Sequence, residues 1–440
     1  MSTSTLPPHR AEAAYTPPMV VGEFAMDADV VIIGGGPAGY ACAEAAARGG
    51  RTVTVIDSSD PNAIDSTTAR HMLLRALLAT NMAAEFRLIP DTLQPDLSTI
   101  MPMVAAAQQQ GIEHREQLIA TLNLTKIHGT ARFLSGREVQ VAGDHVHRLR
   151  FKRAVICTGS TRSPHSSLDG FDGVISAEHL VTHPEVIAGS VTVLGNSPVA
   201  VETASIASGL GATVTLVTGA SQLLPGIPDE LTELLCQSLP YNVHIGDFSE
   251  ANAAPVIVDA THRIGRTDAL GLSTTSVQQV DCWIETDDRM QTGDARVLAA
   301  GDCIGPPLHA GAAAQQGRIA AETIIGGHAA WDPTAIAQVC HTSPQICWAG
   351  HQKGDQVQTI VSPWAGPATS NERTVLSWDA STSTLTGVGA IGPGACDLAD
   401  GFVTTLEMGT TLQDLADMVP THVSGHCVLG DAARNAMRQA

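Results

Sequence analysis

Residues 30–57 read VVIIGGGPAGYACAEAAARGGRTVTVID, and this stretch decides the fold. The apolar run from Val30 to Ile33 is rich in β-branched residues, which predicts a buried parallel strand. Three glycines in a Gly-x-Gly-x-x-Gly pattern follow and open an Ala-rich helix. A second apolar strand runs from Thr52 to Ile56 and ends on Asp57. This order of strand, tight turn, helix, strand and acid is the dinucleotide-binding fingerprint in its full context.

Each residue of the fingerprint has a physical role. Gly34 allows the tight turn, Gly36 lets a pyrophosphate approach the backbone, and Gly39 lets the helix pack on the strand. The first turn of the helix offers free N–H groups to phosphates. Asp57 can accept hydrogen bonds from a ribose diol. The alternative, a Gly-rich turn that binds nothing, explains neither the two flanking strands nor the acid.

Composition narrows the class of protein. The net charge of −20 argues against nucleic acid and anionic membranes as partners. No apolar run is long enough to cross a bilayer. Residues 1–27 begin with a polar, Pro-rich stretch without the order of a signal peptide, which predicts a disordered tail and a cytoplasmic protein. Nine scattered cysteines without metal-type spacing predict buried thiols and no metal site.

The opening pattern recurs later in the chain. Residues 190–219 read SVTVLGNSPVAVETASIASGLGATVTLVTG, which predicts a second nucleotide-binding unit of strand, turn, helix and strand. Near Trp331 the composition changes, and strands followed by helices predict a separate α+β domain. The remaining periodic segments predict helices at His71–Phe86, Leu97–Gln110 and Ala310–Gly326, strands from Ile119 onward, and a strand at Ala295–Ala300.

With these motifs the chain resembles flavoprotein disulfide reductases of the dihydrolipoamide dehydrogenase and mercuric reductase type. The resemblance runs from about Asp29 to the C-terminus and rests on five motifs in the same order. They are GGGPAGY at 34–40, CTGS at 157–160, the second βαβ unit at 191–217, LAAGDCIG at 298–305 and HTSPQICWAG at 341–350.

The resemblance implies an α/β fold with two Rossmann-like nucleotide-binding domains, one for FAD and one degenerate for NAD(P), and an α+β C-terminal dimerisation domain. The implied FAD-binding domain covers 28–165, and a second segment of the FAD and central domain covers 284–332. The NAD(P)-binding-like domain covers 166–283 and the dimerisation domain 333–440. A homodimer is implied, because in this family the partner subunit completes each active site.

The resemblance also implies which residues bind FAD. The segment of Gly34, Gly36, Pro37, Ala38 and Gly39 would face the pyrophosphate, Asp57 the adenosine ribose, Thr130 and Ala131 the adenine, and Asp302 the ribityl or pyrophosphate portion. Leu308, His309 and Ala310 would lie beneath the carbonyl end of the isoalloxazine, and Ser58, Thr158 and Gly159 are further implied contacts.

The redox disulfide of the family is missing. Its two cysteines, spaced CxxxxC, correspond here to Ser66 and His71, and the lysine that follows them corresponds to Arg75. No cysteine lies between Cys42 and Cys157. Thiol–disulfide exchange needs an attacking thiolate, and neither serine nor imidazole supplies one. We therefore expect no disulfide reduction in the manner of the family.

The second nucleotide site is altered as well. Its fingerprint reads Gly195-x-Ser197-x-x-Ala200, so a side chain stands where a pyrophosphate approaches. The second strand ends at Thr218, with neither an acid for an NAD ribose nor an arginine close behind it for NADP. The loop between Asp247 and Val256 is shorter than in the family. These changes predict a domain that keeps its fold but no longer binds NAD(P). The alternative is a weakened site that still works, so NAD(P) use stays open.

Three histidines are candidates for proton transfer. The family's catalytic histidine, followed by a glutamate, corresponds to His422, whereas Cys427 stands at the glutamate's position and His426 is a second candidate. An unperturbed imidazole titrates near neutral pH, so His422 can shuttle a proton; a purely interfacial role is the alternative. His71 would lie against the central flavin ring and take a proton as hydride leaves a substrate. Its alternative role is packing in place of the lost cysteine.

A lysine–glutamate pair beside the flavin corresponds to Arg75 and Glu202, which we expect to form an ion pair. This pair either stabilises the anion of a reduced flavin or holds two domains together.

Our leading hypothesis is an FAD-dependent oxidoreductase that acts on a small organic substrate without a redox disulfide. The alternatives are an NAD(P)H-dependent reductase of quinones or similar acceptors, and a flavoprotein whose structural FAD serves binding or a redox-neutral reaction.

Overall fold

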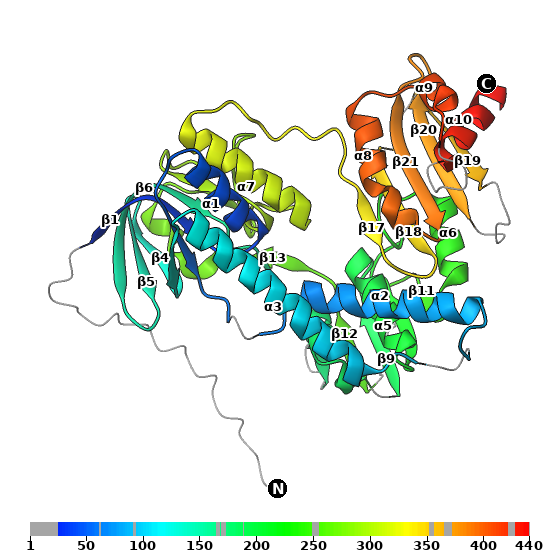
Figure 1. Ribbon diagram of the computed structural model, residues 1–440, viewed down its shortest axis with the longest axis horizontal. Coiled ribbons are helices and arrows are strands. Elements are labelled where there is room, and N and C mark those ends of the chain that lie inside the picture. The colour runs from blue at the N-terminus through cyan, green and yellow to red at the C-terminus, as the bar shows by residue number, and fades with distance from the viewer. Residues whose placement is uncertain are drawn as a thin grey trace, which may run out of the picture.

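The computed structural model describes residues 25–439, except for short gaps. The gaps are 61–62, 91–93, 164–167, 169–172, 188, 249–254, 352–355, 365–371 and 421–426. Three sheets organise the chain, one in each of three units, and the first and last units lie at opposite ends of the molecule (Figure 1). The mixed α/β class predicted from the sequence is confirmed. Within the described residues, no helix is both long enough and apolar enough to cross a membrane.

The first unit is a seven-stranded sheet built around β1 (Met26–Ile33). Val30 and Ile32 pack on one face of the sheet, where α1 (Pro37–Arg48) and α7 (Ala310–Ile325) lie side by side, and Val31 and Ile33 pack on the other. Burial of both faces explains why this strand is apolar without alternation. Its other strands are β2 (Val53–Asp57), β3 (Thr125–His128), β4 (Thr130–Ser135), β5 (Glu138–Ala142), β6 (His147–Ile156) and β16 (Val297–Ala299).

The second unit repeats this arrangement, as the internal duplication predicts. Its five strands are all parallel, in the order β11-β10-β9-β12-β8. The turn at Gly195 connects the central strand β9 to α5, and β9 pairs with β10 on one side and with β12 on the other. The elements are β8 (Val174–Ser176), α4 (Ala177–Thr182), β9 (Ser190–Leu194), α5 (Pro198–Gly209), β10 (Thr213–Val217), α6 (Asp229–Ser238), β11 (Asn242–His244) and β12 (Val256–Asp259).

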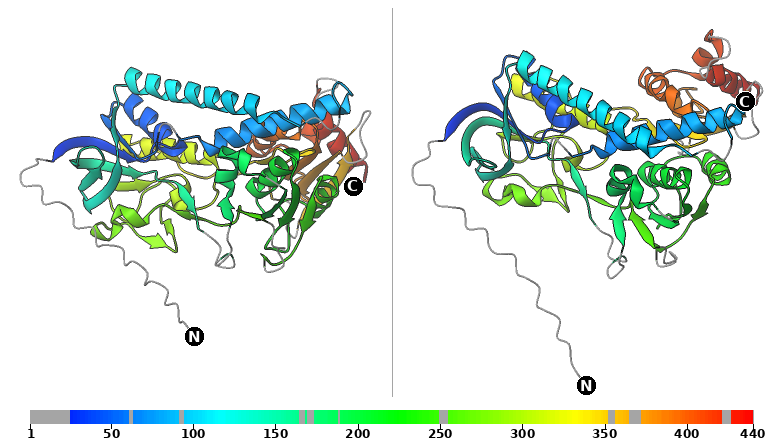
Figure 2. Two further views of the ribbon diagram at one scale, coloured as in Figure 1. Left: turned by 90° about the horizontal axis from the view of Figure 1, so that it is seen from below. Right: turned by 60° about the horizontal axis from the view of Figure 1, so that its bottom comes forward.

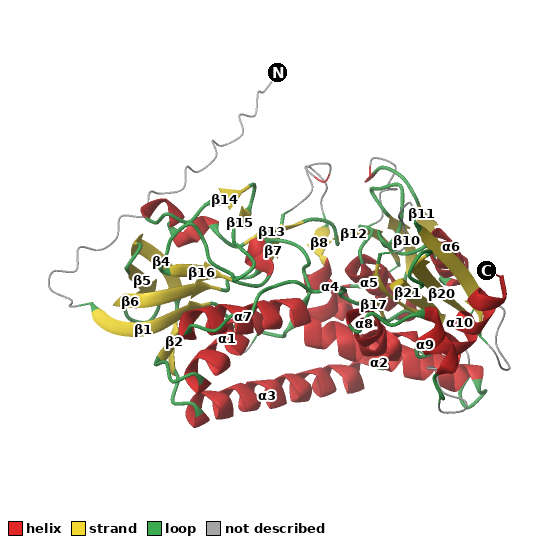
Figure 3. Cartoon of the chain, turned by 90° about the horizontal axis from the view of Figure 1, so that it is seen from above, coloured by secondary structure: helices red, strands yellow, loops and turns green. Residues whose placement is uncertain are grey.

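A pair of long helices joins the units. α2 (Ser66–Glu85) and α3 (Leu97–Thr121) form an antiparallel hairpin along one side of the molecule, which Figures 2 and 3 show from several directions. Asp65 and Asp96 cap the two helices by accepting from backbone N–H groups. Leu73, Leu74 and Leu77 bury the inner face of α2 against the second unit.

The sequence predicted the end of this hairpin incorrectly. Helix α3 continues to Thr121, whereas we expected it to end at Gln110 and strands to begin at Ile119. Ile119 and Leu122 both pack against the core of the first unit. Their spacing of three residues places them on one helical face.

The C-terminal unit is an antiparallel sheet with helices on one face (Figure 1). Cys340, Ile346 and Trp348 on its other face belong to the same hydrophobic core as the second unit. The elements are β17 (Gln338–Cys340), β18 (Gln345–Gly350), β19 (Val357–Pro363), β20 (Arg373–Asp379), β21 (Leu385–Gly392), α8 (Ala399–Glu407), α9 (Leu412–Asp417) and α10 (Cys427–Gln439). Short strand pairs complete the fold at β7 (Ser160–Arg162) with β13 (Arg263–Gly265) and at β14 (Gln279–Val280) with β15 (Trp283–Ile284).

Candidate functional site

The first fingerprint folds into a turn that only glycines can form. Gly34 has a φ of +114°, and a Cβ there would lie 2.1 Å from the carbonyl oxygen of Cys157. A Cβ at Gly39 would lie 1.9 Å from the carbonyl oxygen of Gly34. Both positions therefore need glycine for the protein's own packing, before any ligand is considered.

Gly36 is different, because it faces open space. A Cβ there would meet nothing within 4 Å, and its φ of −83° suits any residue. It is the N-cap of α1, it has no side chain to bond the helix, and Pro37 follows at the first helical position. The exposed N–H groups of this first turn leave a cradle of the right kind for a pyrophosphate.

Asp57 lies beside this cradle, at the end of β2. A Cβ at Gly35 would lie 2.3 Å from Asp57 Oδ2, so the carboxylate approaches the turn closely. The amide and the hydroxyl of Ser59 donate to Asp57 at 3.1 and 2.7 Å. Ser58 is exposed, and at the start of β4 Thr130 is exposed and Ala131 buried. The carboxylate is thus held in place at the edge where a ribose diol is expected.

The opposite side of the cradle is formed by the segment before α7. The N–H of Gly301 donates to Gln316 Oε1 at 2.9 Å, and a Cβ at Gly317 would lie 2.2 Å from the carbonyl oxygen of Ala38. Helices α1 and α7 therefore approach each other closely. Asp302 Oδ2 accepts from the Ser160 hydroxyl at 2.8 Å. His309 caps α7, which begins at Ala310, and Leu308 before it is 41% exposed.

Two features of the cradle are unexplained without a ligand. The hydroxyl oxygen of Thr158 is buried and has no hydrogen-bond partner among the described residues. Gly159 has a φ of +71°, and a Cβ there would meet nothing within 4 Å. A buried hydroxyl without a partner, next in sequence to a glycine that faces open space, suits a bound polar cofactor. The residues present therefore fit an extended dinucleotide such as FAD.

The open space at Gly36 makes a specific prediction. We expect Gly36→Ala to raise the dissociation constant of FAD at least about tenfold, because the new methyl group fills the space that a pyrophosphate must approach. The thermal midpoint of the apoprotein should be unchanged, since the Cβ meets no protein atom. Titration of apoprotein with FAD, followed by flavin fluorescence, measures the first effect. In contrast, Gly39→Ala should destabilise the apoprotein itself, and equal FAD affinity in Gly36→Ala and wild-type protein would contradict the cradle.

A second group of polar residues lies where α2, α5 and β17 meet. Glu202 on α5 is 6% exposed, and its carboxylate contacts Arg70 Nε at 3.1 Å. The backbone N–H of His341 donates to the same carboxylate at 3.0 Å. Burial raises the pKa of Glu202, while Arg70 and the His341 amide act in the opposite direction. Glu202 is thus a buried acid held by one cation and one backbone amide.

The expected ion pair between Arg75 and Glu202 is wrong, because Arg70 takes the place of Arg75. Arg70 lies on the face of α2 that also carries Leu73 and Leu77, and this face packs toward the second unit. Five residues along a helix turn the side chain to a different face, so Arg75 is exposed. Arg75 was matched to the family's lysine by its position in the sequence. That match does not take into account which face of the helix each side chain lies on, so it did not identify Arg70.

His71 packs against a histidine from the C-terminal unit. The rings of His71 and His341 lie 5.9 Å apart, edge to face. Partial desolvation lowers the pKa of His71, the nearby His341 and Arg75 lower it further, and Glu202 acts in the opposite direction. Burial also lowers the pKa of His341, with Arg70 acting in the same direction and Asp397 against it. Both imidazoles are therefore neutral at neutral pH, and each offers one nitrogen that can accept a proton. The sequence signalled His341 only as the first residue of HTSPQICWAG.

The remaining sequence candidates stay apart from this group. His422 and His426 lie outside the described residues, and the side chain of Cys427, at the start of α10, is not described either. The eight cysteines whose side chains the structure describes are all free thiols. Burial raises the pKa of Cys42 and Cys303 to about 12, as expected for inert packing residues.

The second fingerprint keeps the shape of the first but not its polar edge. Gly195 has a φ of +138°, and a Cβ there would lie 2.6 Å from the carbonyl oxygen of Ala260. Ser197 is the N-cap of α5, yet its side chain makes no capping bond. The hydroxyl of Thr218 donates to the carbonyl of Ala220, and a Cβ at Gly219 would lie 2.0 Å from the Phe248 ring. A nucleotide site has its ribose-binding acid at this position. Here the position holds a threonine, which bonds its own loop, and a phenylalanine ring.

Known proteins resemble this chain in sequence and in fold. Residues 28–245 match the model of the family described as pyridine nucleotide-disulphide oxidoreductase. Dihydrolipoyl dehydrogenase 2 of Haloarcula marismortui is 26% identical over 477 residues, covering 96% of this chain and 99% of that protein. Dihydrolipoyl dehydrogenase of Geobacillus stearothermophilus is 24% identical over 468 residues, covering 96% of this chain and 98% of that protein.

A solved structure shows the same fold. The Cu(II) complex of RclA, an HOCl-induced flavoprotein disulfide reductase from Escherichia coli, superposes with a TM-score of 0.80 at 17% identity. The superposition covers 93% of this chain and 99% of that one. With both fingerprints inside the matched residues and relatives aligned almost end to end, this chain belongs to the pyridine nucleotide-disulphide oxidoreductase family of FAD-dependent oxidoreductases.

Proposed function

We propose that this chain oxidises or reduces a small organic substrate at an FAD site without a redox disulfide. One observation carries the proposal. His71 on α2 packs against another imidazole, His341, and no cysteine lies between Cys42 and Cys157. Because disulfide exchange needs a thiolate, this pair supports proton transfer in place of sulfur chemistry.

The residues that would hold the cofactor form the cradle described above. The backbone of Gly36 and the first turn of α1 would bind the pyrophosphate, Asp57 the adenosine ribose and Asp302 the ribityl chain. The Thr158 hydroxyl has no hydrogen-bond partner among the described residues, and it would donate to the cofactor. When bound, FAD supplies two-electron chemistry, and oxygen or a quinone-like compound would be the final acceptor.

His71 is the group we propose to handle the proton. As a neutral imidazole it accepts a proton from a substrate X–H group while the hydride leaves the neighbouring carbon. Glu202 and Arg70 lie behind the two histidines and balance each other's charge. Arg75 lies beside His71, and as a permanent cation it disfavours protonation of the imidazole.

The lowered pKa of His71 predicts the pH dependence of the reaction. A base with a lowered pKa stays deprotonated further into the acid range, so we expect activity to be constant above pH 6.5, the ordinary value for histidine, and to fall only below it. Arg75→Gln removes a neighbouring cation and should shift the acid limb to higher pH. The measurement is kcat/KM against pH for both proteins, with the ionic strength fixed. A shift of the limb to lower pH in Arg75→Gln would contradict the proposed neighbour effect.

A second candidate function follows from the intact second sheet. All five of its parallel strands and the Gly195 turn are retained, so an NAD(P)H-dependent reductase of quinones or similar acceptors is the alternative. The substituted polar edge at Thr218 and Phe248 favours the first proposal. We further propose that the chain forms a homodimer, with His422 of the partner subunit as a further candidate for proton transfer.

Four measurements test the proposed function. The purified protein should show the visible absorbance of oxidised flavin, and protein that neither carries nor binds FAD would overturn the proposal. Anaerobic NADH or NADPH should leave that absorbance unchanged, whereas rapid bleaching would establish the second candidate. Reduction of lipoamide or of aromatic disulfides should be absent; turnover of these compounds would contradict a non-disulfide enzyme. Turnover with the flavin oxidised throughout and no acceptor would identify a structural FAD instead.

A further inference from the structure

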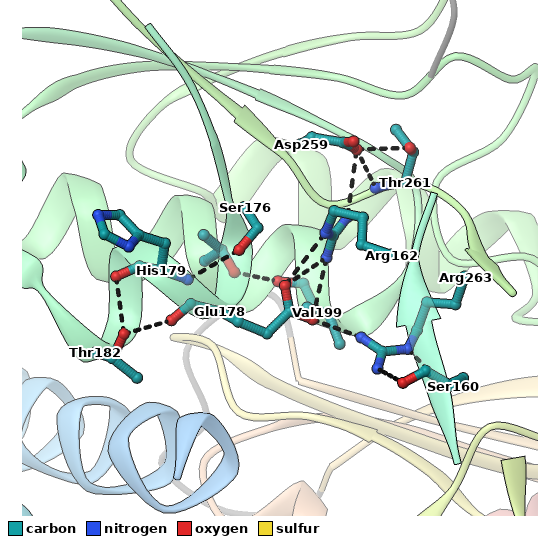
Figure 4. Close-up of polar contacts among 11 residues, drawn as sticks. Ser160, Arg162, Ser176, Glu178, His179, Thr182, Val199, Asp259, Thr261 and Arg263 are labelled. Atoms are coloured by element: carbon teal, nitrogen blue, oxygen red, sulfur yellow. Dashed lines mark hydrogen bonds and ion pairs between the residues drawn. The ribbon is translucent and has the colours of Figure 1, made fainter. Parts of the chain in front are cut away.

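A chain of hydrogen-bonded charged and polar side chains connects the FAD cradle to the second unit. It starts at Asp302, whose carboxylate accepts from the Ser160 hydroxyl. From Ser160 it passes through Arg263 to Glu178 on α4 (Figure 4). Beyond Glu178 it continues through Arg162 to Asp259 at the end of β12. Neither fingerprint includes Arg263 or Glu178, and no step described so far uses them.

The direction of each hydrogen bond in this chain is fixed by chemistry. Arg263 Nε lies 2.8 Å from the Ser160 hydroxyl oxygen, and a guanidinium can only donate. The single hydrogen of Ser160 is therefore free for Asp302, whose Oδ2 lies 2.8 Å away. Ser160 itself is 6% exposed, so water offers it no ready alternative partner. Arg263 thus makes Ser160 a donor to Asp302.

Arg263 is itself held in one orientation. Its Nη1 contacts Glu178 Oε1 at 2.5 Å, and its Nη2 donates to the backbone carbonyl of Ser160 at 3.1 Å. Arg162 binds the same Glu178 from the other side at 3.1 Å, and also Asp259 at 3.3 Å. Three nitrogens of one planar guanidinium are engaged, which a lysine cannot reproduce.

We propose that Arg263 is a positioning residue for the flavin. Through Ser160 it directs the carboxylate of Asp302 toward the ribityl chain, and through Glu178 it ties this geometry to the second unit. The inference rests on the proposed function, because it takes FAD as the occupant of the cradle. Charge assistance strengthens each link, since the chain runs from a cation through a hydroxyl to a carboxylate.

Reconstitution of apoprotein with FAD tests the proposal. Arg263→Ala and Ser160→Ala should each raise the FAD dissociation constant about tenfold, the size expected for a charge-assisted hydrogen bond. The double variant should lose no more than either single variant, because both remove the same relay. Arg263→Lys should resemble Arg263→Ala, although it keeps the charge. The visible band of any bound flavin should shift in all of these variants.

Arg266 provides the matched control. It lies three residues further along, its side chain is exposed, and only its backbone N–H contacts the cradle, at the carbonyl of Gly159. Arg266→Ala should therefore leave FAD affinity unchanged; an equal loss of affinity would show a general charge effect and overturn the proposal.

Asp302→Asn separates failure of this inference from failure of the proposed function. Wild-type protein that binds no FAD would overturn the proposed function together with this inference. If wild-type protein binds FAD, and Asp302→Asn weakens binding while Arg263→Ala stays within twofold of wild type, only the positioning role falls. A lower thermal midpoint of the Arg263→Ala apoprotein with unchanged FAD affinity would likewise reduce Arg263 to a link between the two units.

Discussion

Replacing Arg70 by methionine is expected to lower the free energy of unfolding by about 3 kcal/mol. Arg70 is the only ion-pair partner of Glu202 among the described residues, and Glu202 is 6% exposed. Methionine fills much of the space of the arginine stem but leaves the buried carboxylate unpaired. The value lies at the low end for a buried pair, because the Arg70 side chain is 22% exposed. Urea unfolding of the apoprotein, followed by circular dichroism, measures the change.

A second substitution separates the charge effect from packing. Glu202→Gln in the Arg70→Met background removes the stranded charge and should restore most of the lost stability. The exposed pair of Arg48 and Glu44 gives the matched control, since these side chains are 63% and 42% exposed. Arg48→Met should cost about 0.5 kcal/mol or less. Equal losses for Arg70→Met and Arg48→Met would contradict a buried ion pair.

Local sequence patterns predicted the fold because its main elements are encoded locally. The apolar run at 30–33 is buried on both faces of a sheet, and the glycines at 34 and 39 meet backbone atoms that only glycine can approach. These are properties of neighbouring residues, so the sequence displays them. The sequence did not predict the helix end at Thr121. Over so short a stretch, the spacing of apolar residues near this end fits both the helical and the strand period.

The candidate site depends on long-range contacts, which the sequence does not display. Glu202 could pair with either arginine of α2, and only the packed helical face selects Arg70. His71 and His341 meet across two units, 270 positions apart in the sequence. Arg263 contacts Ser160 across 103 positions and Glu178 across 85. Such contacts depend on how the sheets pack against each other. Family motifs predict only the contacts that all members of the family share.

His71→Ala is expected to slow flavin reduction by the substrate about 100-fold or more, the usual contribution of a positioned base. Stopped-flow measurement under anaerobic conditions, with the absorbance of oxidised flavin as the signal, isolates this step from reoxidation. FAD content and the thermal midpoint should stay near the wild-type values, because the His71 side chain is partly exposed to solvent and the cradle does not use it. The acid limb of the pH profile should disappear together with the base.

The expected result for the neighbouring histidine distinguishes the two roles that His71 can have. His341→Gln keeps the backbone N–H that binds Glu202 and removes only the ring that contacts His71. If His71 is the base, His341→Gln should retain most of the rate and shift the acid limb to higher pH, since His341 contributes to the lowered pKa of His71. If His71→Ala reduces its flavin at the wild-type rate, the imidazole of His71 only packs against His341. The proton of the reaction must then leave through another group, and His422 of the partner subunit becomes the residue to replace next.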